Sequence, residues 1–344
     1  MTPTDHQPPD DLPPEIVTVD NAFVTPLTRG PLRTERGPLR WVRGAVHDRD
    51  GLLVPQSQRL WNGNKKEPVP ADPERVRVAR GARRLRGTWL YAGHWSTHFG
   101  HFLLETLPNL WPDPAEHVAT LSGVLAHRPI RGPLPAAPER VRLQSPELPP
   151  WQRQLMDLVG YGGVDLRVVH GRPVRVERLA VPSRPVVLKR WARPAAVEVW
   201  RRISDAVGRR GSQPRVYLSR TRFHAGALGA GRSRTDKVRD AELDALFSDA
   251  GFYVAHPETL PINEQIELVR GADVLAGLAG SALHLSVFAE PGTRVLTIGD
   301  RRSSRKPTPA QTMVDRSCGH RSTFVPDVDA AGLARALAGL DDPV

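Results

Sequence analysis

Hydrophobic residues in the second half of the chain form short apolar runs separated by segments with helical spacing. The runs have the character of strands buried on both faces: PRVYLSR, FYVAHP, DVLAG and TRVLTIG. The segments between them repeat apolar residues with the period of a helix: DAELDALFSDAGF, PINEQIELVRGA and SALHLSVFAE. This alternation predicts an α/β fold whose C-terminal domain is a doubly wound parallel sheet, with ligands at the carboxyl ends of the strands.

The first half of the chain shows the same alternation less regularly. Strands are predicted in RGTWLYAGHW, GVLAHRPI, VDLRVVHG and VRVERLAVPS, and a helix in PWQRQLMDLVGY. The length of the chain favours two domains. We expect a disordered tail over residues 1–20, an N-terminal α/β domain over 21–190, a linker helix over 191–211 and a Rossmann-like domain over 212–344.

The chain carries 48 basic and 37 acidic residues, and this net charge of +11 favours partners that bear phosphate or carboxylate. The basic residues are scattered and have few aromatic neighbours, which disfavours a nucleic-acid platform. A single cysteine, Cys318, excludes a disulfide framework and a cysteine-ligated zinc site. Together with an N-terminus unlike an export signal it favours the cytoplasm, where the basic surface is also compatible with contact to an anionic inner membrane face.

Two Asp-x-Asp sequences have the form of a motif that some sugar-transferring enzymes use to hold a divalent metal. The first, residues 48–50, precedes Gly51 within a predicted hairpin over residues 39–54, where aspartates are favoured by the turn itself. The second, residues 327–329, precedes the helical sequence AAGLARALAGL, where aspartates are favoured as caps. We interpret both as structural.

The sequence GHWSTHFGHFLLETLPNLWP places His94, His98, His101 and Glu105 at spacings of four, three and four residues. In a helix these side chains share one face. A zinc site there would need three histidines from consecutive turns of one helix, a difficult geometry for a tetrahedral metal, and there is no His-Glu-x-x-His motif. We therefore predict no metal and prefer an active-site helix to a purely structural one.

Chemically capable residues follow three successive strands of the second half. Arginine suits phosphate oxygens, and small residues before a helix let backbone N–H groups approach a diphosphate. Structural alternatives remain for each, because surface arginines, helix caps and turning glycines are common. The candidates are Ser219, Arg220 and Arg222 after the first strand, Glu258, Glu264 and Gln265 after the second, and Gly277, Gly280, Ser281 and His284 around the third.

The order of these motifs resembles the family 61 glycosyltransferases, which include many bacterial capsular polysaccharide biosynthesis proteins. The resemblance is carried by THFGHFLLETLPNLW, VYLSRTR and the long segment from AELDALF to EPGTRVL. It implies a GT-B architecture, in which two Rossmann-like domains face a cleft, with the nucleotide-sugar in the C-terminal domain and the acceptor on the N-terminal side. It also implies inverting transfer from a UDP-sugar.

The family's Ser-Arg pair corresponds to Ser219 and Arg220, and its Glu-Gln pair to Glu264 and Gln265. Its glycine-rich segment corresponds to residues 277–286. This chain departs from the family pattern at several positions: Ala279 in place of histidine, Ala282 in place of glycine, Ser286 in place of asparagine, and Asp240-Ala241-Glu242 where Asn-Glu is expected. We expect these departures to leave the fold intact.

The resemblance and the residues together predict an inverting sugar transferase in surface polysaccharide biosynthesis. His101 or Glu105 would be the base that deprotonates a glycan, lipid-linked or small-molecule acceptor, with His98 orienting a partner or binding substrate. Arg220 and the chain near Gly280 and Ser281 would stabilise the leaving diphosphate without metal or cofactor. The alternatives are a non-catalytic nucleotide-sugar or glycan-binding relative and a basic nucleic-acid-binding protein.

Overall fold

The computed structural model describes residues 14–34, 37–58, 75–79, 81–127, 147–226, 237–301, 303–326 and 330–339. Contacts divide the chain into an N-terminal unit that ends at Leu188 and a C-terminal unit that begins at Lys189. The linker helix predicted over residues 191–211 is α4 (Pro194–Val207), and it belongs to the C-terminal unit. It begins with Pro194 in its first turn and ends at Gly208, whose φ of 72° is the left-handed conformation that glycine adopts easily.

The C-terminal unit contains a five-stranded sheet in the order β12-β11-β13-β14-β15, and every neighbouring pair is parallel. Its first strand in the chain therefore lies between the second and the third. This is the doubly wound order in which the chain winds in opposite directions from the first strand. The strands are β11 (Arg215–Leu218), β12 (Tyr253–Ala255), β13 (Val274–Leu278), β14 (Arg294–Ile298) and β15 (Arg321–Val325).

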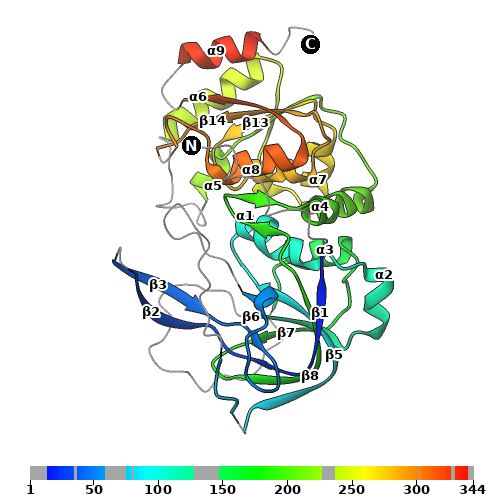
Figure 1. Ribbon diagram of the computed structural model, residues 1–344. Helices are drawn as coiled ribbons and strands as arrows, with labels where there is room; N and C mark the ends of the chain where they lie inside the picture. The colour runs from blue at the N-terminus through cyan, green and yellow to red at the C-terminus, as the bar shows by residue number, and fades with distance from the viewer. Residues whose placement is uncertain are drawn as a thin grey trace. The chain divides into compact units, whose positions relative to one another are not determined.

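Helices cover both faces of this sheet (Figure 1). On one face α6 (Lys237–Asp249) and α9 (Ala330–Ala338) contribute to a buried cluster in which the rings of Tyr217 and Phe247 stack at 4.1 Å. On the other face α4 packs against α7 (Ile262–Arg270) and α8 (Pro309–Cys318). The doubly wound parallel sheet predicted for the C-terminal domain is confirmed, and the unit additionally contains α8 and β15, which the sequence patterns did not single out.

One predicted helix of this unit differs from expectation. The sequence SALHLSVFAE forms a short 3₁₀ helix, η7 (Leu283–Phe288), with hydrogen bonds three residues apart, such as Leu285 N–H to Ala282 C=O at 3.1 Å. All six residues of η7 are buried. Because it is so short, η7 cannot supply the helix dipole that the sequence analysis expected at the third strand end.

The N-terminal unit is built on a six-stranded mixed sheet in the order β4-β1-β8-β5-β6-β7. Four strands are parallel, whereas β1 is antiparallel to both β8 and β4. A Rossmann-like sheet is parallel, so the antiparallel β1 departs from the expectation for the N-terminal domain. The strands are β1 (Ile16–Val24), β4 (Val46–His47), β5 (Arg83–His94), β6 (Gly123–His127), β7 (Leu166–Val169) and β8 (Val174–Pro182).

Two further features of the N-terminal unit differ from the sequence predictions. Residues 16–20, assigned to a disordered tail, form the first part of β1, because the sequence IVTVDNAFV pairs along its length with β8. The predicted hairpin over residues 39–54 has its turn at Asp48–Gly51, and His47 pairs with Leu53 across it as expected. Its first strand is shorter than predicted, because β3 (Gly37–Arg43) pairs instead with β2 (Thr28–Thr34). A short helix, η2 (Pro55–Ser57), and α3 (Pro150–Leu158) complete the elements used below.

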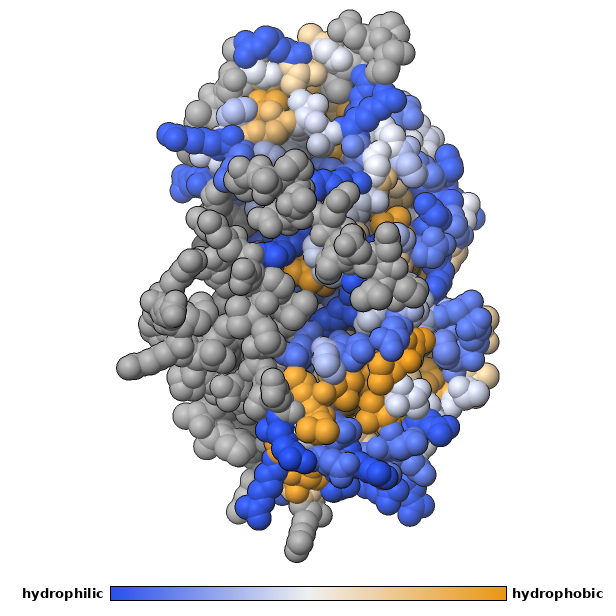
Figure 2. Space-filling model, viewed as in Figure 1, coloured by the Kyte–Doolittle hydropathy of each residue, from blue (hydrophilic) through white to orange (hydrophobic). Residues whose placement is uncertain are grey.

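The visible surface of the C-terminal unit is largely hydrophilic (Figure 2), as expected when the apolar side chains fill the cores on the two faces of its sheet. Among the described residues, only Leu52 and Tyr253 are large hydrophobic side chains with substantial exposure. The described helices include none with the length and apolar character needed to cross a membrane.

We predict that Gly123→Ala destabilises the N-terminal unit. A Cβ at this position, the first of β6, would lie 2.4 Å from both the Asp165 carbonyl oxygen and the Trp89 ring. Overpacking of this kind costs about 1–3 kcal/mol, which urea unfolding measured by tryptophan fluorescence would detect. Gly81→Ala is the matched control, because nothing lies within 4 Å of its added Cβ. Equal unfolding midpoints for the two variants would contradict the prediction.

Candidate functional site

The carboxyl ends of β12, β11 and β13 lie side by side at one edge of the C-terminal sheet. Leu218 of β11 is in register with Ala255 of β12 and Gly277 of β13. The strand order reverses between β11 and β13, and ligands of doubly wound sheets bind at this reversal, outside the carboxyl ends of the strands. Two of the sequence candidates lie on either side of this point: Arg220 in the segment that follows β11, and Ser281 in the segment that follows β13.

Ser219 and Arg220 connect β11 to the short helix α5 (Thr221–Ala225). The buried Ser219 hydroxyl accepts the Thr221 N–H at 3.1 Å and lies 3.2 Å from the Thr221 hydroxyl. Ser219 therefore shapes the turn. Arg220 is half-buried, with its guanidinium 5.4 Å from the centre of the Phe223 ring, whereas Arg222 is exposed. Of the two arginines, Arg220 is the one that the fold holds at the reversal point.

The loop after β13 runs from Ala279 to Ala282. Ala279 is buried and its N–H donates to the Ile298 carbonyl, which continues the pairing with β14. The N–H groups of Ser281 and Ala282 donate to no group within the described residues. These two donors lie at the carboxyl edge and can bind an anion, although without the dipole of a long helix behind them. Gly277, in contrast, lies buried inside β13 and belongs to the sheet, not to the loop.

The candidates after β12 are divided between surface and structural positions. Glu258 is exposed on η6 (Pro257–Thr259), at the carboxyl end of β12. Glu264 is exposed in the first turn of α7, which fits a residue that stabilises the positive end of the helix. Gln265 is buried and donates to the Leu260 carbonyl at 2.8 Å. Its amide therefore fixes the loop that carries Glu258.

His284 belongs to a buried hydrogen-bond network between η7 and α8. Its Nδ1 lies 3.0 Å from Oε1 of Gln311. The Gln311 amide in turn donates to Ser286 Oγ at 3.0 Å and to Asp315 Oδ1 at 2.8 Å. The serine that replaces the family's asparagine at position 286 is thus integrated into a satisfied network. The position of the His284 ring is therefore fixed by its hydrogen bond to Gln311 of α8.

A basic loop follows β14 and was not among the sequence candidates. Asp300 Oδ1 accepts hydrogen bonds from the N–H and hydroxyl of Ser303, both at 3.0 Å, which fixes the start of the loop. Beyond it, Arg301, Arg305 and Lys306 are exposed and make no ion pair within the part of the chain that the structure describes. Since β14 pairs with β13, this loop leaves the sheet beside residues 279–282. Its cluster of charge is visible in the sequence, but its position depends on the strand order.

In the N-terminal unit the candidate stretch after β5 is helical but irregular. It begins as α1 (Phe99–His101), widens into a π-helical turn over Phe102–Thr106 and tightens into a 3₁₀ turn, η4 (Leu107–Leu110). The predicted regular helix is therefore wrong in detail, and His94 is excluded from it because β5 continues to that residue. π-turns inside helices are frequent at functional sites.

Two predicted active-site side chains meet on this segment. His101 Nδ1 lies 2.5 Å from Glu105 Oε2. The rings of His98 and His101 are in edge-to-face contact, with their centroids 5.1 Å apart. The side chain of His101 is 45% exposed and that of Glu105 is 17% exposed. The carboxylate thus accepts the Nδ1 proton and orients a ring whose other edge can face a substrate.

A second cluster at the same sheet edge was missed by sequence reasoning. His94 and His127 end the neighbouring strands β5 and β6, and their rings stack at 5.3 Å. His127 Nε2 lies 2.6 Å from the Thr25 carbonyl and its Nδ1 lies 2.9 Å from the Tyr91 hydroxyl, so the neutral ring donates at Nε2 and accepts at Nδ1. Arg184, shortly after β8, donates to His94 Nδ1 at 3.1 Å. Only the pairing of β5, β6 and β8 could have indicated this cluster.

The structure provides no grouping of three or more His, Cys, Asp or Glu side chains suited to a metal within its described ranges. Asp48 uses its carboxylate within its own turn, where Oδ1 accepts the N–H groups of Asp50 and Leu52 at 2.9 and 2.8 Å. The predicted role of Asp48 in the turn is confirmed. The second Asp-x-Asp sequence, residues 327–329, lies outside the described residues.

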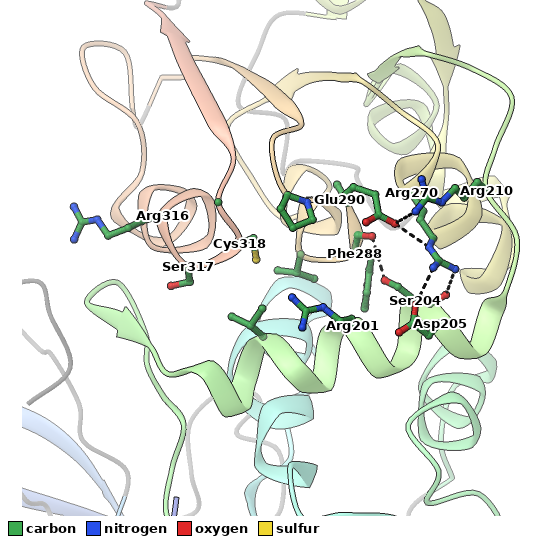
Figure 3. Close-up of a pocket in the computed structure, with 15 residues that line it drawn as sticks. Arg201, Ser204, Asp205, Arg210, Arg270, Phe288, Glu290, Arg316, Ser317 and Cys318 are labelled. Carbon is green, nitrogen blue, oxygen red and sulfur yellow. Dashed lines mark hydrogen bonds and ion pairs between the residues drawn. The ribbon is translucent and has the colours of Figure 1, made fainter. Parts of the chain in front are cut away.

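A cavity of about 420 Å³ lies at the opposite, amino edge of the C-terminal sheet (Figure 3). Its walls include Arg210, Arg270 and Glu290, which precede β11, β13 and β14. Arg270 and Arg210 both pair with Glu290, at 3.3 and 2.8 Å. Cys318 also lines it, and burial, followed by the nearby Asp315 charge, raises the pKa of its thiol to about 12. The cavity is therefore separate from the carboxyl-edge residues described above.

The family model for Glycosyltransferase 61 matches residues 99–296, which is more than half of the chain and runs from α1 to β14. The chain belongs to glycosyltransferase family 61, whose members transfer a sugar from a donor to an acceptor. The match includes both His101 and Glu105 and the residues at the β11–β13 reversal. No curated protein compared with the chain matches it.

We predict that acid weakens the N-terminal unit through His127. Burial, and to a lesser extent the Arg184 charge, lower its pKa from 6.5 to about 4, against the opposing effect of the Thr25 carbonyl. Between these values the unfolded chain binds a proton that the native chain does not, so stability falls as the pH drops below 6.5. The expected loss is about 2 kcal/mol at pH 5, at roughly 1.4 kcal/mol per pH unit.

His127→Gln cannot titrate and serves as the reference for this prediction. Urea unfolding at pH 7 and pH 5 should show that the stability advantage of the native protein over the variant shrinks by about 2 kcal/mol. Parallel pH profiles for the two proteins would show that His127 is not the group responsible.

Proposed function

We propose that this family 61 member is an inverting glycosyltransferase that uses a UDP-sugar. The observation that carries the proposal is the reversal of strand order between β11 and β13, which brings Arg220 and the donors of Ser281 and Ala282 to one ligand-binding edge. A guanidinium and two backbone N–H groups match the negative charge of a diphosphate. The exposed cations of the loop after β14 add to the same electrostatic field.

In this proposal the C-terminal edge stabilises the leaving UDP as its negative charge develops. Arg220 is the main charged contact, with Ser281 near the diphosphate and Arg222 at the periphery. Glu258 and Glu264, both exposed at or near the end of β12, are proposed to contact the sugar or the base of the donor. Ser219, Gln265, Gly277 and His284 then act indirectly, by holding the loops that carry these groups.

The proposed base is the His101 imidazole, with Glu105 as its orienting carboxylate. With the Nδ1 proton held by Glu105 at 2.5 Å, Nε2 carries the lone pair that can accept the acceptor's hydroxyl proton. The oxygen thus activated attacks the anomeric carbon as the bond to UDP breaks, which inverts that centre. His98, in edge contact with His101, is placed to bind the acceptor. Because Arg220 and backbone N–H groups donate the hydrogen bonds that stabilise the leaving diphosphate, the proposed mechanism needs no metal.

We further propose that the two units are the two domains of a GT-B enzyme, with the donor on the C-terminal unit and the acceptor on the N-terminal unit. A glycan or lipid-linked acceptor in surface polysaccharide biosynthesis fits the basic chain, since such acceptors carry phosphate or carboxylate groups. We propose in addition that the enzyme acts in the cytoplasm, with peripheral contact between its basic surface and the anionic inner membrane face.

The test of the proposed function is a thermal-shift screen against UDP, GDP, CMP, dTDP and their sugar conjugates, with and without divalent metal. Because a ligand bound only to the native state raises the unfolding midpoint, UDP and one UDP-sugar are expected to stabilise the protein without metal. Stabilisation by a nucleotide together with absence of any product in acceptor assays would instead support the non-catalytic binding alternative. Stabilisation by metal alone would overturn the proposal.

We predict that Arg220→Ala weakens UDP binding by about 10- to 100-fold, because a charge-assisted hydrogen bond contributes about 1.5–3 kcal/mol. Isothermal calorimetry of the full chain measures this directly. Arg321→Ala is the matched control, since Arg321 is exposed at the start of β15, on the amino edge of the same sheet. Similar UDP affinities for both variants would remove Arg220 from the donor site.

We predict that His101→Ala and Glu105→Gln each lower turnover by about 10²–10⁴-fold, the usual contribution of general base catalysis. The KM for the UDP-sugar should change little, because neither residue belongs to the donor half. His117→Ala is the control, because His117 is half-exposed and its contact with the Glu116 side chain is a long one of 3.9 Å. Near-native turnover in folded His101→Ala and Glu105→Gln proteins would exclude the pair as the base.

A further inference from the structure

The helix that follows Arg220 is too short to be stable by its own hydrogen bonds. α5 has five residues, Thr221–Ala225, whereas isolated helices shorter than about 12–15 residues are marginal in water. It packs against α6, which begins at Lys237. The position of α5, and of the neighbouring Arg220, therefore depends on the contacts between α5 and α6.

A buried hydrogen bond between two side chains holds α5 to α6. His224 Nδ1 lies 2.5 Å from Asp240 Oδ2, and the two side chains are only 1% and 2% exposed. His224 belongs to α5 and Asp240 to the first turn of α6. Along α6, Leu243 and Phe247 are buried against the sheet, which makes the helix a rigid support for Asp240.

Arg220 is attached to α5 in two ways. Its carbonyl accepts the His224 N–H at 2.9 Å, so the backbone of the arginine is tied to the paired histidine. Its guanidinium lies over the ring of Phe223, the residue that precedes His224. A displacement of His224 would therefore move both the backbone of Arg220 and the aromatic surface on which its side chain rests.

Stability alone gives little reason for such a pair. Removing a carboxylate and an imidazole from water is costly, and apolar residues of similar volume often stabilise a protein as well or better. The cost is increased here because His224 Nε2 is buried and finds no hydrogen-bond partner among the described residues. What a buried hydrogen bond offers in return is a fixed direction and distance between two elements, which apolar packing does not impose.

We propose that His224 and Asp240 are positioning residues that hold α5, and through it Arg220, in the orientation that binds the donor diphosphate. This inference rests on the proposed function, because it acts through Arg220. Neither residue touches the donor. Their contribution is to reduce the number of positions that the arginine occupies before the diphosphate arrives.

The experiment compares two amide replacements of His224 by calorimetric titration of the full chain with UDP. His224→Asn places an amide N–H close to the position of Nδ1 and can still donate to Asp240. His224→Gln has the same chemistry, but its amide extends to the position of Nε2 and does not reproduce the bond. We expect His224→Gln to weaken UDP binding about tenfold and His224→Asn to restore it to within about threefold of the native value.

A double-mutant cycle with Arg220→Ala separates positioning from a merely structural effect. If His224 acts through Arg220, His224→Gln should weaken UDP binding in the native background and have no further effect in Arg220→Ala. The variant with both His224→Leu and Asp240→Leu removes the pair without leaving a buried charge. It should remain folded, as its thermal midpoint would show, and still lose about tenfold in UDP affinity.

The outcomes that overturn the inference are distinct from those that overturn the proposed function. Unchanged UDP affinity in His224→Gln and in the double leucine variant, with weakened binding in Arg220→Ala, overturns the positioning role alone. Fully additive losses in the cycle also overturn it, since they show an effect independent of Arg220. Unchanged affinity in Arg220→Ala overturns both the donor-binding role of that arginine and the inference that depends on it.

Discussion

The parallel alignment of the five strands in the C-terminal unit is the constraint on which its candidate site depends. Because every strand runs in the same direction, the segments that leave the strands all emerge at one edge. The turn after β11, the loop after β13 and the basic loop after β14 come from distant parts of the sequence, yet the hydrogen-bond ladders set their spacing. The rigid core, in which Tyr217 stacks on Phe247, then supports these segments from one face.

The candidate base in the N-terminal unit depends on local geometry in a different way. His101 and Glu105 are four residues apart, and the π-helical turn between them still brings Nδ1 and Oε2 to 2.5 Å. Packing in the core fixes this turn, because the side chains of Phe102, Leu103 and Leu104 are almost completely buried. The apolar side chains therefore anchor the segment while the histidine and carboxylate lie on its more exposed side, as a reactive pair requires.

The sequence was sufficient for strands β11 to β14 and for helices α6 and α7 of the C-terminal unit, because buried parallel strands and amphipathic helices have distinct hydrophobic periods. It was also sufficient to place Arg220 and Ser281 at strand ends. It could not show that β1 joins the N-terminal sheet antiparallel, or that His94, His127 and Arg184 meet, since these facts depend on pairings between distant strands. The 3₁₀ form of η7 was missed because its apolar pattern also fits an α-helix.

The departures from the family pattern have different structural consequences. Ser286 hydrogen-bonds to Gln311, and Gln311 also holds His284 and Asp315, so the serine is compensated within the fold. Ala279 is buried and its backbone continues the ladder to β14, so this position contributes no side chain to the chemistry. The alanine offers no polar side chain at this position, while its backbone keeps the hydrogen bond to Ile298. Among the groups proposed to stabilise the leaving diphosphate, Arg220 is therefore the main charged side chain, and the rigidity of its attachment to α5 matters correspondingly.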